Sequence, residues 1–114
     1  MESLPVIVKS YELYKDLIEA QKHLSKSWRH SLGLSSENSV LQLMEELVMA
    51  KSAPKTTKAM YLIKANATLE VLTLKLRLLL ELKLVNSTRA FQLQAKTSEI
   101  GRMLGGWLKS VQSM

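Results

Sequence analysis

The side chains that could carry chemistry in this chain are two histidines, ten carboxylates and sixteen lysines and arginines. His23 and His30 are seven residues apart and could share a helix face, but a metal there would need further imidazole or carboxylate ligands, and the acids are dispersed. Glu45 and Glu46 are adjacent, so on a helix they point about 100° apart and form no acid/base pair. Cysteine is absent, which excludes thiolate metal sites, cysteine nucleophiles and disulfides. No Walker loop, dinucleotide fingerprint or metalloprotease pair occurs. We therefore predict a protein that is not an enzyme and that holds no metal or cofactor.

Basic side chains are the stronger candidates for function. Residues 1–50 carry five basic and seven acidic side chains, a balance of −2, whereas residues 51–114 carry eleven and three, a balance of +8. A basic half of this density is typical of nucleic-acid binding, because it concentrates anions near the surface. An ordinary lysine-rich, solvated helix surface is an equally good interpretation of the charge alone.

Four of these cations lie on the predicted last helix with spacings of seven, six and seven residues, and we expect them on one broad face: Arg89, Lys96, Arg102 and Lys109. Their contacts with phosphates would be salt-sensitive and independent of sequence. The same charge could instead dock an acidic face of a protein partner. Phe91, Trp28 and Trp107, with three tyrosines, are the side chains that could stack on bases. The two tryptophans fit the core better, because of their helical spacing.

Three glycines interrupt the same helix near its end. Gly101 and Gly105 are four residues apart and share a face, with Gly106 and Trp107 beside them. Because glycine in a helix costs about 1 kcal/mol relative to alanine, we expect a compensating close contact with another helix along this strip. A helix end at Gly105 is the alternative. We favour a continuous helix, because the apolar stripe extends to Val111.

Four amphipathic segments must position these residues. We expect the first helix to begin at Leu4 and Pro5 with Ser3 as its cap, to fade through residues 25–27 and to stop by Gly33. The second helix should begin at residues 35–37 and end at a break at Pro54. The third and fourth helices should span residues 57–84 and 87–111. The predicted core face of the first helix is Ile7, Tyr11, Tyr14 and Ile18, widened by Leu13, Leu17 and Leu24. The predicted core faces of the second and fourth helices are Val40, Leu43, Met44, Leu47 and Val48, and Ala90, Leu93, Thr97, Ile100, Leu104, Trp107 and Val111. Alternating patterns typical of strands are absent. The prediction is one all-α domain over residues 1–114, an antiparallel up-and-down four-helix bundle.

The third predicted helix is apolar around most of its circumference between Leu69 and Leu84. Such a helix must be covered on several sides, so we expect part of its surface to meet another subunit of a homo-oligomer, with Leu78, Leu79 and Leu82 at the interface. The charges within this run exclude a membrane span, and residues 1–8 lack a secretory signal. We therefore expect a cytoplasmic protein.

Several motifs together resemble a known family. They are Ile-Gly-Arg-Met-Leu-Gly-Gly-Trp-Leu-Lys at residues 100–109, Arg-His-Ser-Leu-Gly at 29–33, Lys-Ala-Asn at 64–66 and the leucine-rich run at 76–84. From about Leu4 to Ser110 the chain resembles the small four-helix-bundle proteins of bacteria and phages. These include the accessory variability determinants of diversity-generating retroelements and the proteins encoded by ribosomal RNA intervening sequences.

The resemblance to the accessory variability determinants implies a non-catalytic partner of the retroelement reverse transcriptase. It implies a pentameric barrel with a basic surface that associates with template RNA and its complementary DNA during mutagenic copying. Arg29, Arg77, Arg102 and Lys109 lie in the matching motifs, whereas residues 34–37 lack the basic residue that the family pattern has. The intervening-sequence branch implies instead a helical module that binds protein or ribosomal RNA. A neighbouring reverse transcriptase gene with a near-identical repeat pair would distinguish the two.

Overall fold

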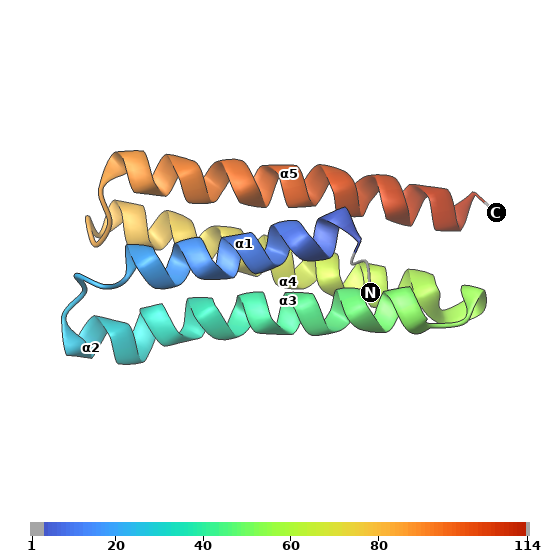
Figure 1. Cartoon of the computed structure of the whole chain (residues 1–114), viewed down its shortest axis with the longest axis horizontal. Coiled ribbons are helices and arrows are strands. Elements are labelled where there is room, and N and C mark those ends of the chain that lie inside the picture. The colour runs from blue at the N-terminus through green and yellow to red at the C-terminus, as the bar shows by residue number, and fades with distance from the viewer. Residues whose placement is uncertain (1–3, 114) are drawn as a thin grey trace.

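The structure, a computed structural model that describes residues 4–113, consists of four long antiparallel helices lying side by side (Figure 1). These are α1 (Pro5–Ala20), α3 (Leu34–Ser52), α4 (Lys55–Glu81) and α5 (Ser87–Gln112). Two short elements, α2 (Lys26–Trp28) and η1 (Arg29–Gly33), precede α3 and run directly into it. The described residues contain no strand, and the all-α, four-helix prediction is confirmed.

Local sequence signals fix most of the helix ends. Pro5 stands in the first turn of α1, where its missing N–H has no partner to lose. Pro54 separates α3 from α4, as predicted. The Oδ1 atom of Asn86 accepts a hydrogen bond of 2.7 Å from the backbone N–H of Arg89 and thereby caps α5. The predicted cap at Ser3 lies outside the described residues.

The predicted helix end at Gly33 is wrong. The chain is helical from Lys26 onward, with one π-helical turn, η1, that ends at Gly33 and continues into α3. Glycine is needed here for close packing and not for a turn: a Cβ atom at Gly33 would lie 2.5 Å from Oε1 of the buried Gln21 and 3.2 Å from the carbonyl oxygen of Trp28.

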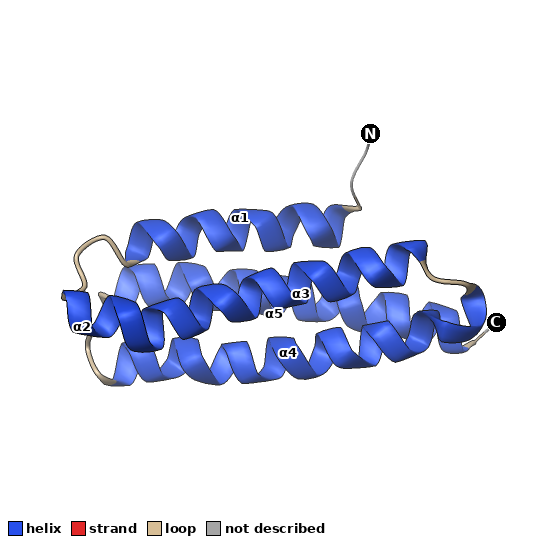
Figure 2. Ribbon diagram, turned by 90° about the horizontal axis from the view of Figure 1, so that it is seen from below, coloured by secondary structure: helices blue, strands red, loops and turns tan. Residues whose placement is uncertain are grey.

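The four long helices occupy the corners of a square in the order α1, α3, α4, α5 (Figure 2). Each helix packs against its two neighbours and turns one apolar stripe toward the centre. Leucines fill most of this core, and the fully buried ones are Leu13, Leu17, Leu43, Leu47, Leu62, Leu72, Leu79, Leu93 and Leu104. The predicted core face of α5 is confirmed, with Trp107 and Val111 half-buried at its end.

The predicted core face of the first helix is confirmed at Leu13, Leu17 and Leu24 and wrong at Tyr11 and Ile18. The buried side chains are Val6, Ser10, Leu13 and Leu17, whereas Tyr11 and Ile18 are 56% and 40% exposed. Ser10 is accommodated in the core because its hydroxyl donates a 2.8 Å hydrogen bond to the carbonyl oxygen of Val6. In α3, Val48 is likewise exposed, at 48%. The bundle therefore has more apolar side chains than its own core can bury.

Candidate functional site

The four cations predicted to share one face of α5 lie in two groups. Arg89 and Lys96 are half-buried, whereas Arg102 and Lys109 are exposed. The six-residue step from Lys96 to Arg102 turns about 240° around a helix, so the second pair points well away from the first. The expectation of one basic face along α5 is therefore wrong.

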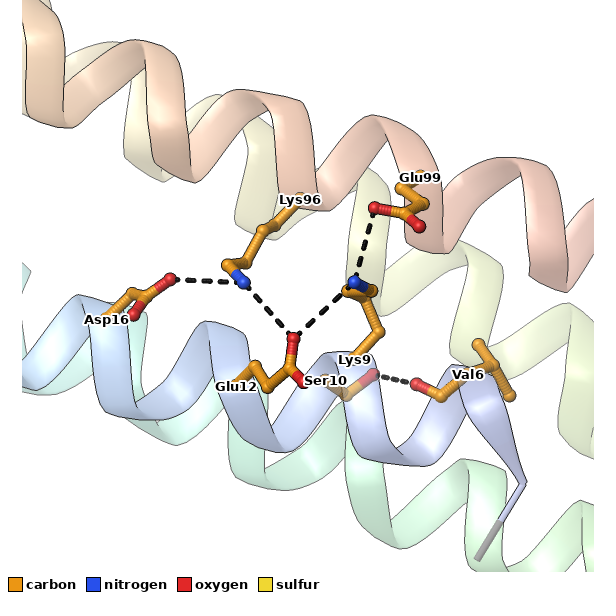
Figure 3. A network of polar contacts seen from close by, with 7 residues as sticks. All are labelled: Val6, Lys9, Ser10, Glu12, Asp16, Lys96 and Glu99. Carbon is orange, nitrogen blue, oxygen red and sulfur yellow. Dashed lines mark hydrogen bonds and ion pairs between the residues drawn. The ribbon is translucent and has the colours of Figure 1, made fainter.

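Lys96 belongs to an ion-pair network between α5 and α1 (Figure 3). Its Nζ atom lies 3.2 Å from Oε1 of Glu12 and 3.4 Å from Oδ2 of Asp16. Lys9 extends the network, at 3.5 Å from both Glu12 and Glu99. The side chain of Lys96 is only 24% exposed. Lys96 thus holds α1 against α5, and its contact with nucleic acid or a partner stays a prediction.

The pKa values of these groups follow from the network. The hydrogen bond from Lys96, with the positive charge of Lys9, lowers the pKa of Glu12. Burial lowers the pKa of Lys96, but its hydrogen bond to Glu12 and the charge of Asp16 outweigh burial, so the net shift is upward. The hydrogen bond from Lys22 lowers the pKa of Glu19, and the charge of Arg89 contributes. Arg89 therefore also has an acidic neighbour on α1.

The other predicted cations are exposed and make no ion pair with the described residues: Arg29, Arg77, Arg102 and Lys109. Lys75 points from α4 toward α3, because it bonds Ser39. Arg77 follows two residues later, about 200° around the helix, so it lies on the flank of α4 toward α5. Arg102 and Lys109 lie on the outer surface of α5, and Arg29 lies in η1 at one end of the bundle. Three of the four cations thus gather on the α4–α5 side.

Exposed aromatic side chains differ from those expected. Phe91, on the outer surface of α5, is 73% exposed, and Trp28 is 39% exposed rather than in the core. Trp107 is half-buried against the core, and Nζ of Lys58 lies 5.9 Å from the centre of its ring. The eleven residues from Phe91 to Arg102 complete just over three turns, so these two side chains point nearly the same way. Phe91, one of the side chains that could stack on bases, is thus exposed beside Arg102 and stays a candidate.

The glycine strip does not pack closely within the chain. α5 continues through Gly105 and Gly106 to Gln112, which confirms the continuous helix. A Cβ atom at either glycine would meet no atom within 4 Å, and one at Gly101 would make an ordinary 3.6 Å contact with Leu69. The prediction of close helix packing at Gly101, Gly105 and Gly106 is therefore wrong for contacts within the chain.

An uncovered apolar stripe runs along the outside of α4. Its members are three or four residues apart and all exposed: Met60, Ile63, Ala67, Val71, Leu74 and Leu78, which we call the α4 stripe. Leu82, in the turn after α4, is also exposed, at 43%. Leu79 has no exposed surface and belongs to the core, so its predicted place at a subunit interface is wrong. The unpartnered apolar surface begins much nearer the start of α4 than the sequence indicated.

Residues 4–113 contain no group of three or more side chains that could hold a metal ion. An apolar pocket lies at one end of the bundle and is lined by Leu4, Pro5, Val6, Met103 and Trp107, with Lys51 and Lys58. It contains neither a carboxylate nor an imidazole. No described helix has a stretch long and apolar enough to cross a membrane.

These features define a class of protein, a small all-α bundle with exposed cations on one side and uncovered apolar surface on another. The chain belongs to the bAvd-like family, the bacterial accessory variability determinants, whose family model matches residues 6–111. No curated protein matches the chain significantly.

Proposed function

We propose that this protein is a non-catalytic accessory protein of a diversity-generating retroelement. The observation that carries the proposal is the family match over residues 6–111. In this role the protein is a homo-oligomer, a pentamer, that binds the reverse transcriptase together with template RNA and its complementary DNA. The α4 stripe supports the assembly, because burial of exposed apolar side chains against another subunit is favourable.

The exposed cations on the α4–α5 side would contact the nucleic acid. Arg77, Arg102 and Lys109 make no ion pair with the described residues, so phosphate binding breaks no existing contact. Arginine and lysine bound to phosphates give affinity without strong sequence preference. An oligomer repeats this set in every subunit, so individually weak contacts act together.

A filter-binding titration tests the nucleic-acid part of this proposal. We expect the double variant Arg102→Gln, Lys109→Gln to bind RNAs of different sequence more weakly, by a similar factor for each RNA. The slope of log affinity against log salt concentration should become shallower by about one unit per lost contact in each subunit. The matched control is Lys15→Gln, Lys51→Gln, which removes the same charge from exposed positions on α1 and α3. Absence of RNA or DNA binding by the wild-type protein at low salt would overturn this part, as would equal losses in both variants.

A separate experiment tests the partner. The protein is co-expressed with the reverse transcriptase from the same locus and captured by a tag after nuclease treatment, so that nucleic acid cannot bridge the two. Retention of the reverse transcriptase supports the proposal. A locus without a reverse transcriptase gene and repeat pair would overturn the retroelement role and favour an intervening-sequence type of interaction module.

A further inference from the structure

Two neighbouring faces of the bundle carry exposed apolar side chains, and α3 is common to both. The first is the α3–α4 face, where Ala67 and Val71 of the α4 stripe lie beside Ser39 and Gln42 of α3. The second is the α1–α3 face, with Tyr11 and Ile18 from α1 and Leu41 and Val48 from α3, all at least 40% exposed. Nothing in the described chain covers either face.

The contacts of neighbouring residues assign these side chains to their faces. Ser39 and Glu46 of α3 point toward α4, because they bond Lys75 and Thr68, each at 2.6 Å. Leu41 and Val48 each follow one of them by two residues, about 200° around the helix, so they lie on the side toward α1.

The same step on α1 assigns Tyr11 and Ile18. Lys9 and Asp16 point toward α5, because they pair with Glu99 and Lys96. Tyr11 and Ile18 follow them by two residues and therefore lie on the side of α1 away from α5, toward α3. Tyr11, Ile18 and Val48, which the sequence pattern places in the core, thus form a second apolar face together with Leu41.

The two faces carry complementary charges at the same height. On the α3–α4 face, Nζ of Lys75 donates to Oγ of Ser39 at 2.6 Å and to the carbonyl oxygen of Ser35 at 3.3 Å, both uncharged groups. Within residues 4–113 this half-buried ammonium has no acidic partner, and its third N–H is available. Glu37 lies two residues from each of the two serines, about 200° around α3, and is therefore on the α1–α3 face. Like Lys75, it makes no ion pair with the described residues.

We propose that the α1–α3 face of one subunit packs against the α3–α4 face of the next, with Glu37 of one copy paired to Lys75 of its neighbour. This inference rests on the homo-oligomer of the proposed function and names its interface. A second copy is the occupant because one chain supplies both apolar faces, both unpaired charges and the matching height. Burial of Lys75 without such a partner would leave an uncompensated charge among apolar side chains.

The geometry of this contact leads to a closed ring. The two faces are adjacent sides of a square bundle, so their outward directions differ by about 90°, and each repeat of the contact rotates the next subunit by a similar angle. A ring built from this contact closes after about four subunits when the outward directions of the two faces differ by about 90°. It closes after five subunits when they differ by about 108°. Because the ring uses α1, α3 and α4, the outer surface of α5 with Arg102 and Lys109 stays accessible to nucleic acid.

Charge reversal tests the pairing. Lys75→Glu and Glu37→Lys are each expected to weaken assembly at least tenfold in sedimentation equilibrium, since each places like charges at the interface. The double variant is expected to recover most of the loss. Glu70→Lys, which changes the charge of an exposed α4 residue outside the stripe, is the control and should assemble like the wild type. Circular dichroism checks the fold, because Lys75 also bonds Ser35 and Ser39 within the chain.

A second variant keeps the test decisive where Lys75→Glu does not fold. Leu41→Glu alters only an exposed side chain of the α1–α3 face and should produce smaller species. A wild-type monomer of 12.9 kDa would overturn the oligomer of the proposed function. If the wild type is an oligomer, that part of the proposed function stands. The interface is overturned if Leu41→Glu then assembles normally, or if Lys75→Glu and Glu37→Lys do not rescue each other.

Discussion

The open surroundings of Gly105 predict that alanine at this position stabilises the protein. Gly105 lies inside α5, and a Cβ atom added there would meet no atom within 4 Å. Gly105→Ala therefore introduces no clash and removes no contact. It reduces the conformational entropy that the unfolded chain loses on folding, which is worth about 1 kcal/mol in a helix interior.

The effect is large enough to measure. For a domain of this size, a gain of about 1 kcal/mol corresponds to a rise in Tm of about 4 °C. Urea and thermal unfolding, followed by circular dichroism at low and high protein concentration, would provide both values. Gly33→Ala is the matched control, because its Cβ atom would lie 2.5 Å from Oε1 of Gln21, and we expect a smaller gain or a loss.

A destabilised Gly105→Ala variant would refute this reasoning. Its concentration dependence would indicate the reason. A loss that appears only at concentrations where the protein assembles would mean that Gly105 approaches another subunit, as the glycine spacing suggests. A loss at every concentration would mean that the surroundings of α5 differ from those described.

Four further substitutions test the fold and the assembly. Leu79→Ala, in the fully buried core, should lower the free energy of unfolding by about 2–5 kcal/mol in urea titrations, whereas Leu78→Ala should chiefly weaken assembly in sedimentation experiments. Asn86→Ala removes the cap of α5 and should cost about 1 kcal/mol in the same titrations. Because Lys96 lowers the pKa of Glu12, that carboxylate stabilises the fold above its unfolded pKa, near 4.5, and the stabilisation is lost as the pH falls through the lower folded value. Glu12→Gln should therefore be less stable than the wild type at neutral pH, and the difference should shrink as the pH falls below about 4.5 in urea unfolding.

The helices that the sequence predicted best are those whose ends depend on local chemistry. Pro54 cannot continue a helix and Asn86 is a strong cap, so the break before α4 and the start of α5 were predictable from single residues. Gly33 was misjudged because its role is tertiary. Only the position of Gln21 against it explains why this glycine stands inside a helical stretch.

The buried face of α1 could not be chosen from periodicity. Two apolar stripes run along this helix, one through Leu13 and Leu17 and one through Tyr11 and Ile18, and both have helical spacing. Packing against α3 and α5 decides between them. The discarded stripe is informative, because an apolar face that the core does not need is available to another subunit.

The candidate binding site was predicted only in part, because spacing along one helix says nothing about charges on its neighbour. Lys96 meets an acid on α1 that lies 84 residues earlier in the sequence, and no local pattern reports that contact. Arg102 and Lys109 meet none among the described residues, and they stayed candidates for the reason first given, exposed positive charge.

The antiparallel topology also changes how the charge of the two halves of the chain should be understood. The acidic first half includes α1, and folding places α1 directly against α5 of the basic half, so Glu12 and Asp16 neutralise cations on the inner flank of α5. Arg77, Arg102 and Lys109 keep their positive charge unpaired among the described residues and lie on the side of the bundle away from α1. In the proposed function a phosphate backbone would therefore meet the outer surface of α5 and the adjoining flank of α4, and not every basic residue of the C-terminal half of the sequence.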